Sequence, residues 1–476
     1  LLEEDFDRIS IFIDDAKKLN RICSRLNKLT KGIILRVISS EEFEKKSCGD
    51  VLTISFPGTL KAKYLDLIKW TKSGQLNDAR KAGVNLAKKS KNSKILVCTT
   101  AQKFSEELIK GYLLRRYEFS NYKTIEDKGV GSVTLMLKRP KDFEKSLLET
   151  KAIVDGVFFT RNLVNEPANI LNTVEFSNRL KELATIGVDV EILEEKKLAE
   201  LGMNALLGVG QGSANPSKVV VMSWKGLSEN TKPLALVGKG VVFDTGGISL
   251  KPAGGMEDMT MDMGGAGVVA GTMLSLAKRK AKANVVGLVG LVENMPSSTA
   301  QRPGDIVKSM KGDTIEVINT DAEGRLVLSD LLWYTQERFK PTGIIDLATL
   351  TGAIIVALGH ENAGVFSNDD EFCNSFLKAA NQENEGAWRM PLGPIYDKKL
   401  KSRLADMKNV GGRDAGAITA AQFIQRFIKK DMPWIHIDIA GAAHTKSESP
   451  FAPAGATGWG VMSLNRLVSE KFENNK

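Results

Sequence analysis

Histidine and cysteine are scarce in this sequence of 476 residues, which has three histidines and four cysteines. The cysteines are scattered without a CxxC pair, which argues against a disulfide framework or a thiolate metal site and is typical of a reducing cytoplasm. No GxSxG segment is present, as an α/β-hydrolase would require, and a serine hydrolase could draw only on His360, His436 or His444. The Walker A motif of nucleotide triphosphate sites is also missing.

Long hydrophobic runs are lacking as well. No apolar run reaches the length of a membrane span, and no charged-then-apolar signal peptide opens the sequence. We therefore expect a cytoplasmic protein that does not associate with membranes. The sequence starts at Leu1 rather than methionine, so a lost leader stays open as an alternative. With 42% hydrophobic and 26% charged residues, the composition is that of an ordinary globular protein.

The net charge of +9 is unevenly distributed. Residues 1–150 contain 30 basic and 20 acidic side chains, whereas the remaining 36 basic and 37 acidic side chains nearly cancel. Together with the length, this asymmetry predicts two domains, residues 1–150 and 151–476. A polar segment running into a long helix over about 142–165 is the expected linker.

The basic N-terminal part raises DNA binding as an alternative. Its densest run lacks the interleaved aromatic residues of a single-strand platform, and such runs are usually solvated helix faces. DNA binding therefore depends on charge asymmetry alone. The residues of the run are Arg80, Lys81, Lys88, Lys89, Lys91 and Lys94.

Apolar strands alternate with amphipathic helices along the chain, which predicts an α/β fold. In the N-terminal domain we expect strands at 9–13, 32–37, 51–56, 95–98 and 132–137, with helices near 14–27, 77–90 and 104–114. The glycine-rich segment at 206–212 is interpreted as a tight turn at a strand exit rather than a dinucleotide loop. From residue 219 onward we expect strands at 219–224, 233–243, 284–292, 314–319, 343–350 and 434–440, with helices near 264–281, 324–339 and 416–430.

This alternation predicts a mostly parallel, doubly wound sheet in the larger domain, with helices on both faces. Active sites in such sheets lie beyond the carboxyl ends of the strands.

The segment 319–326, NTDAEGRL, places acids and a guanidinium at every second position. On an extended strand end, Asp321, Glu323 and Arg325 would share one face, and carboxylates so close together are costly without a cation. The alternative is a helix start whose acids are favoured by the helix dipole.

Two glycine-rich segments upstream add Asp244 and Asp262, with Lys239 and Lys251 beside them. A glycosidase pair would leave two of the four carboxylates unexplained, whereas a pair of divalent cations accounts for all of them. Oxygen donors alone favour magnesium or manganese. The lysines either balance charge or polarise a substrate carbonyl, as amide hydrolysis requires. The residues by themselves thus indicate a metal-assisted hydrolase.

Seven segments together resemble the leucyl aminopeptidase (cytosol aminopeptidase) family of two-metal exopeptidases. The resemblance covers about residues 155–465 and is highly specific, whereas the N-terminal domain shows no comparable match and is a variable part of the family. The segments are NTDAEGRL (319–326), VGKGVVFDTGGISLKP (237–252), 256–265, LVNEPAN (163–169), LLGVGQGS (206–213), ATLTGA (348–353) and WIHIDIAG (434–441).

The resemblance implies two zinc or manganese ions per subunit and a water bridging them as the nucleophile. Glu323 would bridge the ions with Asp244, and Asp321 would serve one ion through its carboxylate and main-chain carbonyl. Lys239 and Asp262 would complete the shell of the other ion. A lysine ligand must be neutral, which two adjacent dications enforce.

The resemblance also implies the catalytic and substrate-binding residues. Lys251 would polarise the scissile carbonyl, and Arg325 would hold a bicarbonate that acts as general base. The first side chain of a peptide with a free N-terminus would enter a mostly apolar pocket, so leucine-like residues are expected. The pocket residues would be Met259, Asn319, Ala322, Thr349 and Gly352.

Members of the family are homohexamers, which is therefore the expected assembly. Some bacterial members also bind DNA as architectural or regulatory factors, which keeps that alternative open. A cysteinyl-glycine dipeptidase with the same site is a further alternative that differs only in substrate.

Overall fold

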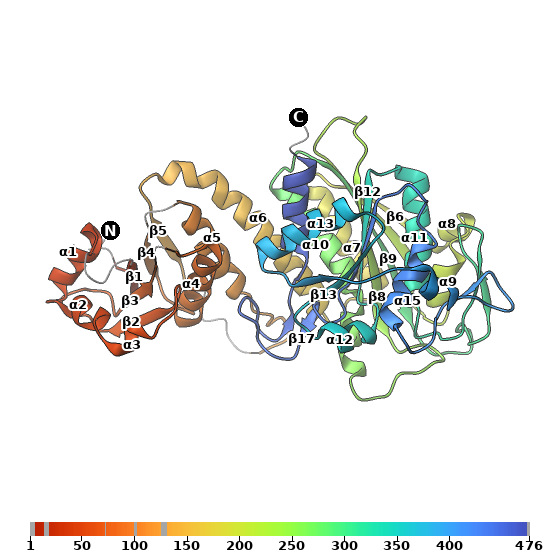
Figure 1. The fold of residues 1–476 in the computed structure, drawn as a ribbon, viewed down its shortest axis with the longest axis horizontal. Coiled ribbons are helices and arrows are strands. Elements are labelled where there is room, and N and C mark those ends of the chain that lie inside the picture. The colour runs from red at the N-terminus through yellow and green to blue at the C-terminus, as the bar shows by residue number, and fades with distance from the viewer. Residues whose placement is uncertain (1–4, 14–18, 72, 100–101, 125–130, 474–476) are drawn as a thin grey trace. The chain divides into compact units, whose positions relative to one another are not determined.

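The computed structural model describes residues 5–13, 19–71, 73–99, 102–124 and 131–473 and separates into two compact units (Figure 1). The first unit comprises Leu1–Val154 with Glu448–Pro453, and the second comprises Asp155–Ser447 with Ala454–Lys476. Both units are α/β, as the sequence predicts. Among the described residues, no helix combines the length and apolar character needed to cross a membrane.

The first unit is built on a sheet in the order β2-β3-β1-β4-β5, in which β2 and β3 pair antiparallel and the other neighbours pair parallel. Alternate residues of β1 face opposite sides, so Ile9 and Ile11 pack with α1–α3 while Phe12 packs with α4 and α5. The elements are β1 (Arg8–Ile13), α1 (Arg21–Leu29), α2 (Ile33–Ile38), α3 (Glu41–Glu44), β2 (Val51–Ser55), β3 (Tyr64–Lys69), α4 (Leu76–Lys89), β4 (Ile95–Cys98), α5 (Gln102–Arg115) and β5 (Val133–Met136).

One expectation for this unit was wrong, and one strand was not predicted. The run at 32–37 is helix α2 rather than a strand, because Ile34 and Ile38 are buried at a spacing of four residues. Gly32 begins it in the left-handed conformation, at φ +84°. Strand β3 was missed. The expected helix near 14–27 falls partly on residues 14–18, outside the described residues, and α1 itself starts at Arg21 after its cap Asn20.

The second unit contains an eight-stranded sheet in the order β14-β13-β16-β12-β8-β9-β7-β6. Strands β16, β12, β8 and β9 are parallel, and antiparallel pairs flank them on both sides, β13 with β16 and β7 with β9. The prediction of a parallel-rich sheet is confirmed, but the antiparallel edges were not expected. The strands are β6 (Asp189–Glu194), β7 (Lys218–Lys225), β8 (Leu234–Asp244), β9 (Asn284–Asn294), β12 (Gly343–Ala348), β13 (Ala363–Ser367), β14 (Ala387–Arg389) and β16 (Trp434–Asp438).

Helices cover both faces of this sheet (Figure 1). A Cβ atom on Gly287 of β9 would lie 2.9 Å from Met273 of α10, and one on Gly290 would lie 2.7 Å from Val327 of α11. The helices are α6 (Pro140–Asn165), α7 (Thr173–Lys181), η1 (Glu182–Ile186), α8 (Glu195–Glu200), α9 (Asn204–Gly210), η2 (Met256–Met263), α10 (Gly264–Lys278), α11 (Gly324–Phe339), α12 (Gly352–Leu358), α13 (Asp370–Glu383), α14 (Pro394–Lys398), α15 (Gly416–Gln425), α16 (Val461–Leu467) and η3 (Val468–Phe472).

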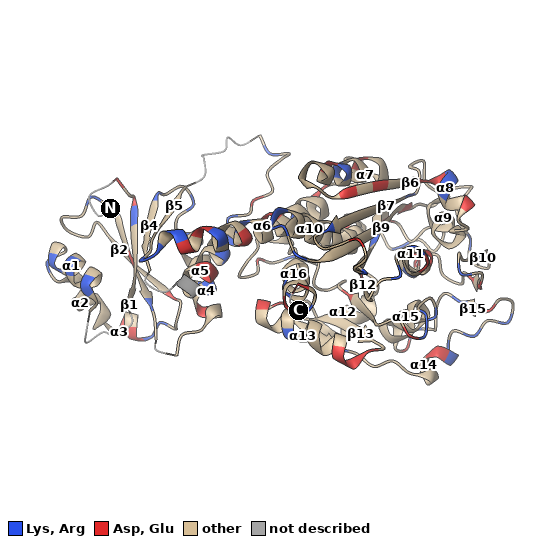
Figure 2. Ribbon diagram, turned by 90° about the horizontal axis from the view of Figure 1, so that it is seen from above, with Lys and Arg blue, Asp and Glu red and all other residues tan. Residues whose placement is uncertain are grey.

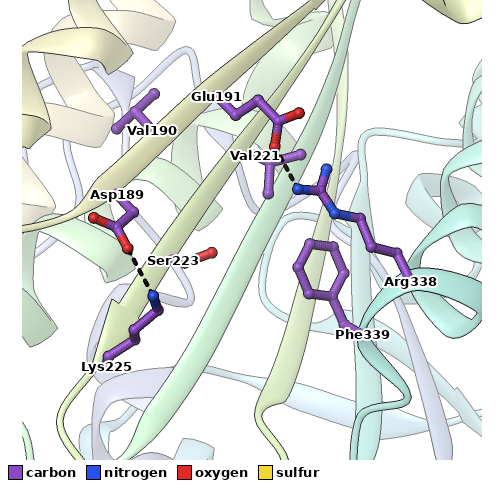
Figure 3. A pocket seen from close by; sticks show the side chains of 8 residues that line it. All are labelled: Asp189, Val190, Glu191, Val221, Ser223, Lys225, Arg338 and Phe339. Atoms are coloured by element: carbon purple, nitrogen blue, oxygen red, sulfur yellow. Dashed lines mark hydrogen bonds and ion pairs between the residues drawn. The ribbon is translucent and has the colours of Figure 1, made fainter. Parts of the chain in front are cut away.

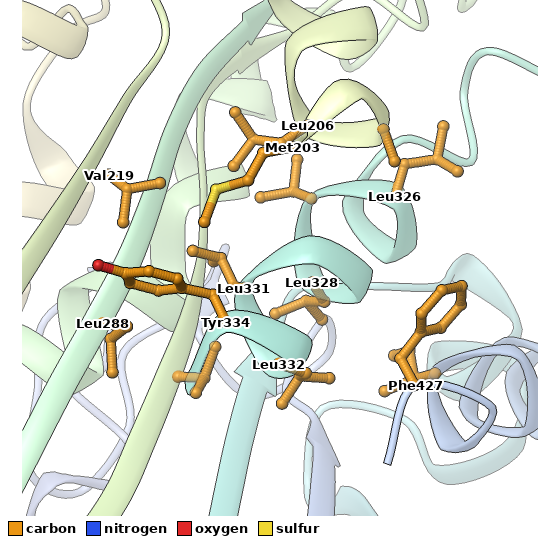
Figure 4. Packing of buried hydrophobic residues seen from close by; sticks show 14 of the residues in the cluster. Met203, Leu206, Val219, Leu288, Leu326, Leu328, Leu331, Leu332, Tyr334 and Phe427 are labelled. Atoms are coloured by element: carbon orange, nitrogen blue, oxygen red, sulfur yellow. The ribbon is translucent and has the colours of Figure 1, made fainter. Parts of the chain in front are cut away.

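Helix α11 is buried on most of its circumference (Figure 4). Leu331 and Tyr334 lie in one core cluster with Met203, Leu206 and residues of β7 and β9. The glycine-rich segment at 206–212 therefore does not form the expected strand-exit turn: most of it belongs to α9, whose apolar side packs under α11. This packing holds the N-terminus of α11 in a fixed place.

The expected strand 314–319 is shorter and belongs to a different sheet. It ends at Glu316 as β11 (Thr314–Glu316), between β10 (Ile306–Lys308) and β15 (Met407–Lys408). A second small sheet joins β17 (His444–Thr445) and β18 (Gly455–Ala456). The segment that carries Asp321 and Glu323 is thus a loop between β11 and α11, not the end of a strand in the main sheet.

Candidate metal centre

Three segments bring buried carboxylates together at the carboxyl end of β8. Asp244 is the last residue of β8, Asp262 lies in η2 just before α10, and Glu323 directly precedes α11. Each has one oxygen within 4.8 Å of the others. The three side chains are buried, so these carboxylates form a group that is shielded from solvent.

Two lysines lie among these acids. Lys239, on β8, places its Nζ 2.8 Å from Asp262 Oδ1 and 2.7 Å from Glu323 Oε1, and donates to the carbonyl oxygen of Thr349 at 2.9 Å. Lys251 places its Nζ 2.7 Å from Asp244 Oδ2 and also pairs with Asp321. The cluster therefore combines four carboxylates with two ammonium groups.

Gly324 gives Lys239 the space that it occupies. A Cβ atom at this position would lie 2.6 Å from the Cδ and Cε atoms of Lys239 and 2.8 Å from its Nζ. Ordinary side-chain contacts are not that close, so any larger residue here displaces the lysine. This is a packing reason for the glycine of the NTDAEGRL segment.

The charges of the cluster do not balance. Burial raises the pKa of Asp262 well above its usual value and raises that of Asp244. Burial lowers the pKa of Lys239 and Lys251, but the neighbouring carboxylates outweigh it and both pKa values are raised overall. Four acids with two lysines leave an excess of negative charge in a buried place.

Three buried carboxylate oxygens of the cluster lack a hydrogen-bond partner among the described residues: Asp262 Oδ2, Asp321 Oδ1 and Glu323 Oε2. Of these, Asp321 Oδ1 forms an ion pair with Lys251. Buried polar atoms are nearly always satisfied, and unsatisfied ones call for an ion or water. Spare carboxylate oxygens and excess negative charge fit divalent cations. Lys239 fits as a ligand only in its neutral form, because an ammonium group has no lone pair to give.

Arg325 lies in the first turn of α11, and its Nη1 donates to the carbonyl oxygen of Asn409 at 2.8 Å. Burial lowers its pKa to about 10, against the opposing effect of Glu323, Asp438 and Asp321. Its Nε atom is buried without a partner among the described residues. No ion pair joins Arg325 to Asp321 or Glu323 in the described part of the chain. Asp321 and Glu323 lie in a loop and Arg325 lies in a helix, so the three residues do not share one face of a strand as expected.

The five expected pocket residues lie on the segments that surround the acids. Thr349 Oγ1 donates to Asp262 Oδ1 at 2.8 Å, and Asn319 Oδ1 accepts from the backbone N–H of Asp321 at 2.9 Å. Met259 lies in η2, and Ala322 precedes Glu323 in the loop. Gly352 begins α12, and a Cβ atom there would meet nothing within 4 Å, so this position borders open space.

Sequence reasoning missed two buried asparagines. Asn294, at the end of β9, donates through Nδ2 to Asp244 Oδ1 at 2.8 Å and to the carbonyl oxygen of Thr320 at 3.1 Å. The sequence did indicate its position. Both β8 and β9 were expected, and neighbouring parallel strands end at the same edge of a sheet, so a polar residue at the end of β9 could be expected to lie near Asp244. Asn409 contacts the loop 318–322 from a segment some 90 residues later, and no sequence pattern indicated it.

A surface hollow of about 280 Å³ lies elsewhere, at the β6–β7 edge of the sheet (Figure 3). Asp189 pairs there with Lys225 at 3.1 Å, and Glu191 pairs with Arg338 at 2.5 Å. Each carboxylate already has a cationic partner and is partly exposed. The hollow therefore offers no spare acid for a metal, unlike the cluster at the end of β8.

Comparisons with known proteins show which family the chain resembles, and the matched region includes all residues of the cluster. Residues 158–465 match the family model described as "Cytosol aminopeptidase family, catalytic domain". A probable cytosol aminopeptidase of Cereibacter sphaeroides is 57% identical over 98% of this chain and 95% of its own length, and one of Xanthobacter autotrophicus is 48% identical over 94% of each.

Two solved structures have the same fold over nearly the whole chain. A tomato leucine aminopeptidase mutant superposes with a TM-score of 0.87 at 32% identity, covering 98% of this chain and 94% of its own. The bottromycin maturation enzyme BotP in complex with Mn superposes with a TM-score of 0.84 at 28% identity, covering 97% of this chain and 99% of its own.

Proposed function

The chain belongs to the cytosol aminopeptidase family, and we propose that the buried carboxylate cluster at the end of β8 is its two-metal catalytic centre. The protein is a metal-dependent aminopeptidase that acts on the N-terminus of peptides. The observation that carries the proposal is the pair of buried, unpartnered carboxylate oxygens on Asp262 and Glu323 in a cluster with excess negative charge.

Five residues would hold two divalent ions, zinc or manganese. When bound, such a pair supplies Lewis acidity and a water nucleophile at neutral pH. Glu323 and Asp244 would serve both ions. Neutral Lys239 with Asp262 would serve one ion, and Asp321 the other. Manganese is the better supported choice, because the related enzyme BotP was solved with Mn.

Lys251 would act on the substrate carbonyl. Its ammonium group pairs with Asp244 and Asp321 at the rim of the cluster, and it is less buried than Lys239. From that position it donates a hydrogen bond to the developing oxyanion and stabilises charge in the transition state. In the metal-free protein the neighbouring carboxylates outweigh burial and raise the pKa of Lys251.

Arg325 would bind a bicarbonate ion that takes the proton of the nucleophile. The unpartnered Nε gives the guanidinium a free donor for a planar anion, and Nη1 is already held by Asn409. A carbonate base also accounts for a site without a histidine among its proposed residues.

Specificity would come from Met259, Asn319, Ala322, Thr349 and Gly352. Methionine, alanine and glycine make this lining largely apolar, which favours leucine or methionine as the first residue. Cysteinyl-glycine would be a poorer substrate of the same site, because its first side chain buries less apolar surface.

The test is release of p-nitroaniline from leucine p-nitroanilide by protein stripped with chelator and then titrated with Mn²⁺ or Zn²⁺. We expect metal-dependent turnover and none with the N-acetylated substrate, because the blocked amine cannot bind at the centre. Turnover of the blocked substrate, or no turnover by the metal-loaded protein, would refute the proposal.

We further propose a cytoplasmic homohexamer, in keeping with the names of the relatives and the family resemblance. DNA binding gains no support from the comparisons. Several cations of the basic run are already paired with acids, and Figure 2 shows acidic residues among the basic ones in this unit. These pairs are Arg80 with Glu107, Lys81 with Asp50, Lys88 with Glu448 and Lys91 with Glu118.

A further inference from the structure

Asn409 is a fully buried residue whose polar groups all point to one segment of the chain. It directly follows β15, and its backbone N–H donates to the carbonyl oxygen of Glu316 at 3.0 Å. That bond extends the β11–β15 pairing up to the start of the loop that carries Asp321 and Glu323.

The side-chain amide of Asn409 is saturated by this loop. Its Oδ1 accepts from the backbone N–H groups of Ile318 at 2.8 Å and Asn319 at 3.3 Å. Its Nδ2 donates to the carbonyl oxygens of Asn319 at 2.7 Å and Ala322 at 3.3 Å. A primary amide has two acceptor lone pairs and two N–H donors, so these four bonds use its whole capacity.

The backbone carbonyl of Asn409 reaches the next functional group. It accepts from Arg325 Nη1 at 2.8 Å, which leaves the Nε of this guanidinium without a partner among the described residues. The loop at 317–323 is neither strand nor helix, so its backbone polar groups depend on bonds of this kind. One residue thus fixes both the loop and the arginine.

We propose that Asn409 is a positioning residue of the aminopeptidase reaction. It holds the loop that presents Asp321 and Glu323 and orients Arg325, although it does not itself touch metal or substrate. The inference depends on the proposed roles of those three residues. Replacing a residue that orients metal ligands without binding the metal typically lowers metal affinity or activity by about 10- to 100-fold.

Asn284 provides a matched control. It is buried at the start of β9, at the other end of the strand from Asn294. Its Oδ1 accepts from Leu227 N–H at 2.9 Å, and its Nδ2 donates to the carbonyl oxygens of Ser228 at 2.8 Å and Thr231 at 2.9 Å. It therefore clamps a loop with the same chemistry, away from the site.

The experiment compares Asn409→Asp with Asn284→Asp in the full chain. Each change replaces two N–H donors by an oxygen that faces carbonyl oxygens. For Asn409→Asp we expect kcat on leucine p-nitroanilide to fall about 10- to 100-fold with a smaller change in KM, and Kd for Mn²⁺ by calorimetry to rise by a similar factor. For Asn284→Asp we expect a lower Tm but kcat and Kd close to those of the wild type.

Two results would overturn the proposal: wild-type kcat and Kd in Asn409→Asp, or equal losses in both variants. If the wild type does not hydrolyse the anilide, the proposed function fails, but the Mn²⁺ affinities of the two variants still decide whether Asn409 positions the loop. If Asn409→Asp does not fold, Asn409→Ser is measured with the same expectations.

A double-mutant cycle tests the link to Arg325. If Asn409 acts partly through the guanidinium, the loss of kcat/KM in Asn409→Asp with Arg325→Lys will be smaller than the product of the two single losses. If the loss of kcat/KM in the double variant equals the product of the two single losses, Asn409 does not act through Arg325.

Discussion

A buried ionic cluster lies in each unit, and the two differ in charge balance. In the first unit, Glu107 accepts from Arg80 Nε at 2.7 Å and from Lys110 Nζ at 2.9 Å. Burial alone would raise the pKa of Glu107, but the two cations outweigh it and the pKa is lowered. In the second unit, acids outnumber lysines, and the pKa values of Asp244, Asp262 and Asp321 are raised.

The difference separates a structural cluster from one that needs a cation. Where cations are sufficient, the acid gains from ionisation, and the pair contributes to folding. Where acids are in excess, ionisation costs free energy that only a bound cation offsets. In these two clusters the pKa shifts follow the charge balance, lowered for Glu107 beside two cations and raised for Asp244, Asp262 and Asp321.

Removing a carboxylate from the second cluster should have the largest effect. We expect Glu323→Ala to lower kcat/KM at least about 10³-fold, because several kcal/mol of transition-state stabilisation are lost with the metals. The Tm of the metal-free protein should not fall, since one of the repelling charges is gone. A large drop in that Tm would mean that Glu323 is structural, as Glu107 is.

Glu107→Gln should have the opposite profile. It removes the carboxylate that pairs with the buried Arg80 and Lys110, so the free energy of unfolding measured in urea should fall by about 3–5 kcal/mol. The aminopeptidase activity of the folded protein should stay at the wild-type level. A loss of activity without loss of stability would contradict the contrast between the clusters.

The pH dependence of this stability follows from the lowered pKa of Glu107. A carboxyl group whose pKa is depressed in the folded state contributes stability above its unfolded pKa, and the contribution is lost as pH falls through the folded value. The difference in unfolding free energy between wild type and Glu107→Gln should therefore be full at pH 7 and shrink below about pH 4.5. If the difference in unfolding free energy grew on acidification, the pKa of Glu107 would not be lowered in the folded state, which would contradict this account of its ion pairs.

Gly324→Ala tests the packing of Lys239 inside the second cluster. The added methyl group would lie 2.6 Å from the lysine chain, so we expect about 1–3 kcal/mol of destabilisation and a 10- to 100-fold lower kcat. Gly254→Ala is the control, because a Cβ atom there meets nothing within 4 Å. Equal activity in the two variants would show that Lys239 tolerates displacement.

The smallest effect is expected at the surface ion pairs of Figure 3. Arg338→Ala removes the partner of Glu191, but both side chains are partly exposed, so unfolding free energy should change by less than about 1 kcal/mol. Activity should not change. A larger loss of stability would mean that the exposure of these ion pairs does not predict how much they contribute to the free energy of unfolding.

Much of the second unit was predictable from sequence because its parallel strands are long apolar runs that alternate with helices. The acids at 244, 262, 321 and 323 follow from the same pattern and the glycine-rich exits beside them. The loop conformation was not predictable: alternation along a strand was expected for Asp321 and Glu323, but β11 ends at Glu316.

The remaining errors have a physical cause in tertiary contacts. Ile33–Ile38 is rich in β-branched residues, yet it forms a helix because the core accepts Ile34 and Ile38 on one side. Asn409 gave no signal because its partners lie some 90 residues earlier in the chain. Long-range hydrogen bonds leave no periodicity in the sequence.

The most direct test of the contrast between the clusters is the amount of Mn²⁺ bound per chain, measured by equilibrium dialysis and elemental analysis. The account predicts two ions in the wild type and in Glu107→Gln, and loss of tight binding in Glu323→Ala. No tightly bound manganese in the wild type, or undiminished binding in Glu323→Ala, would contradict it.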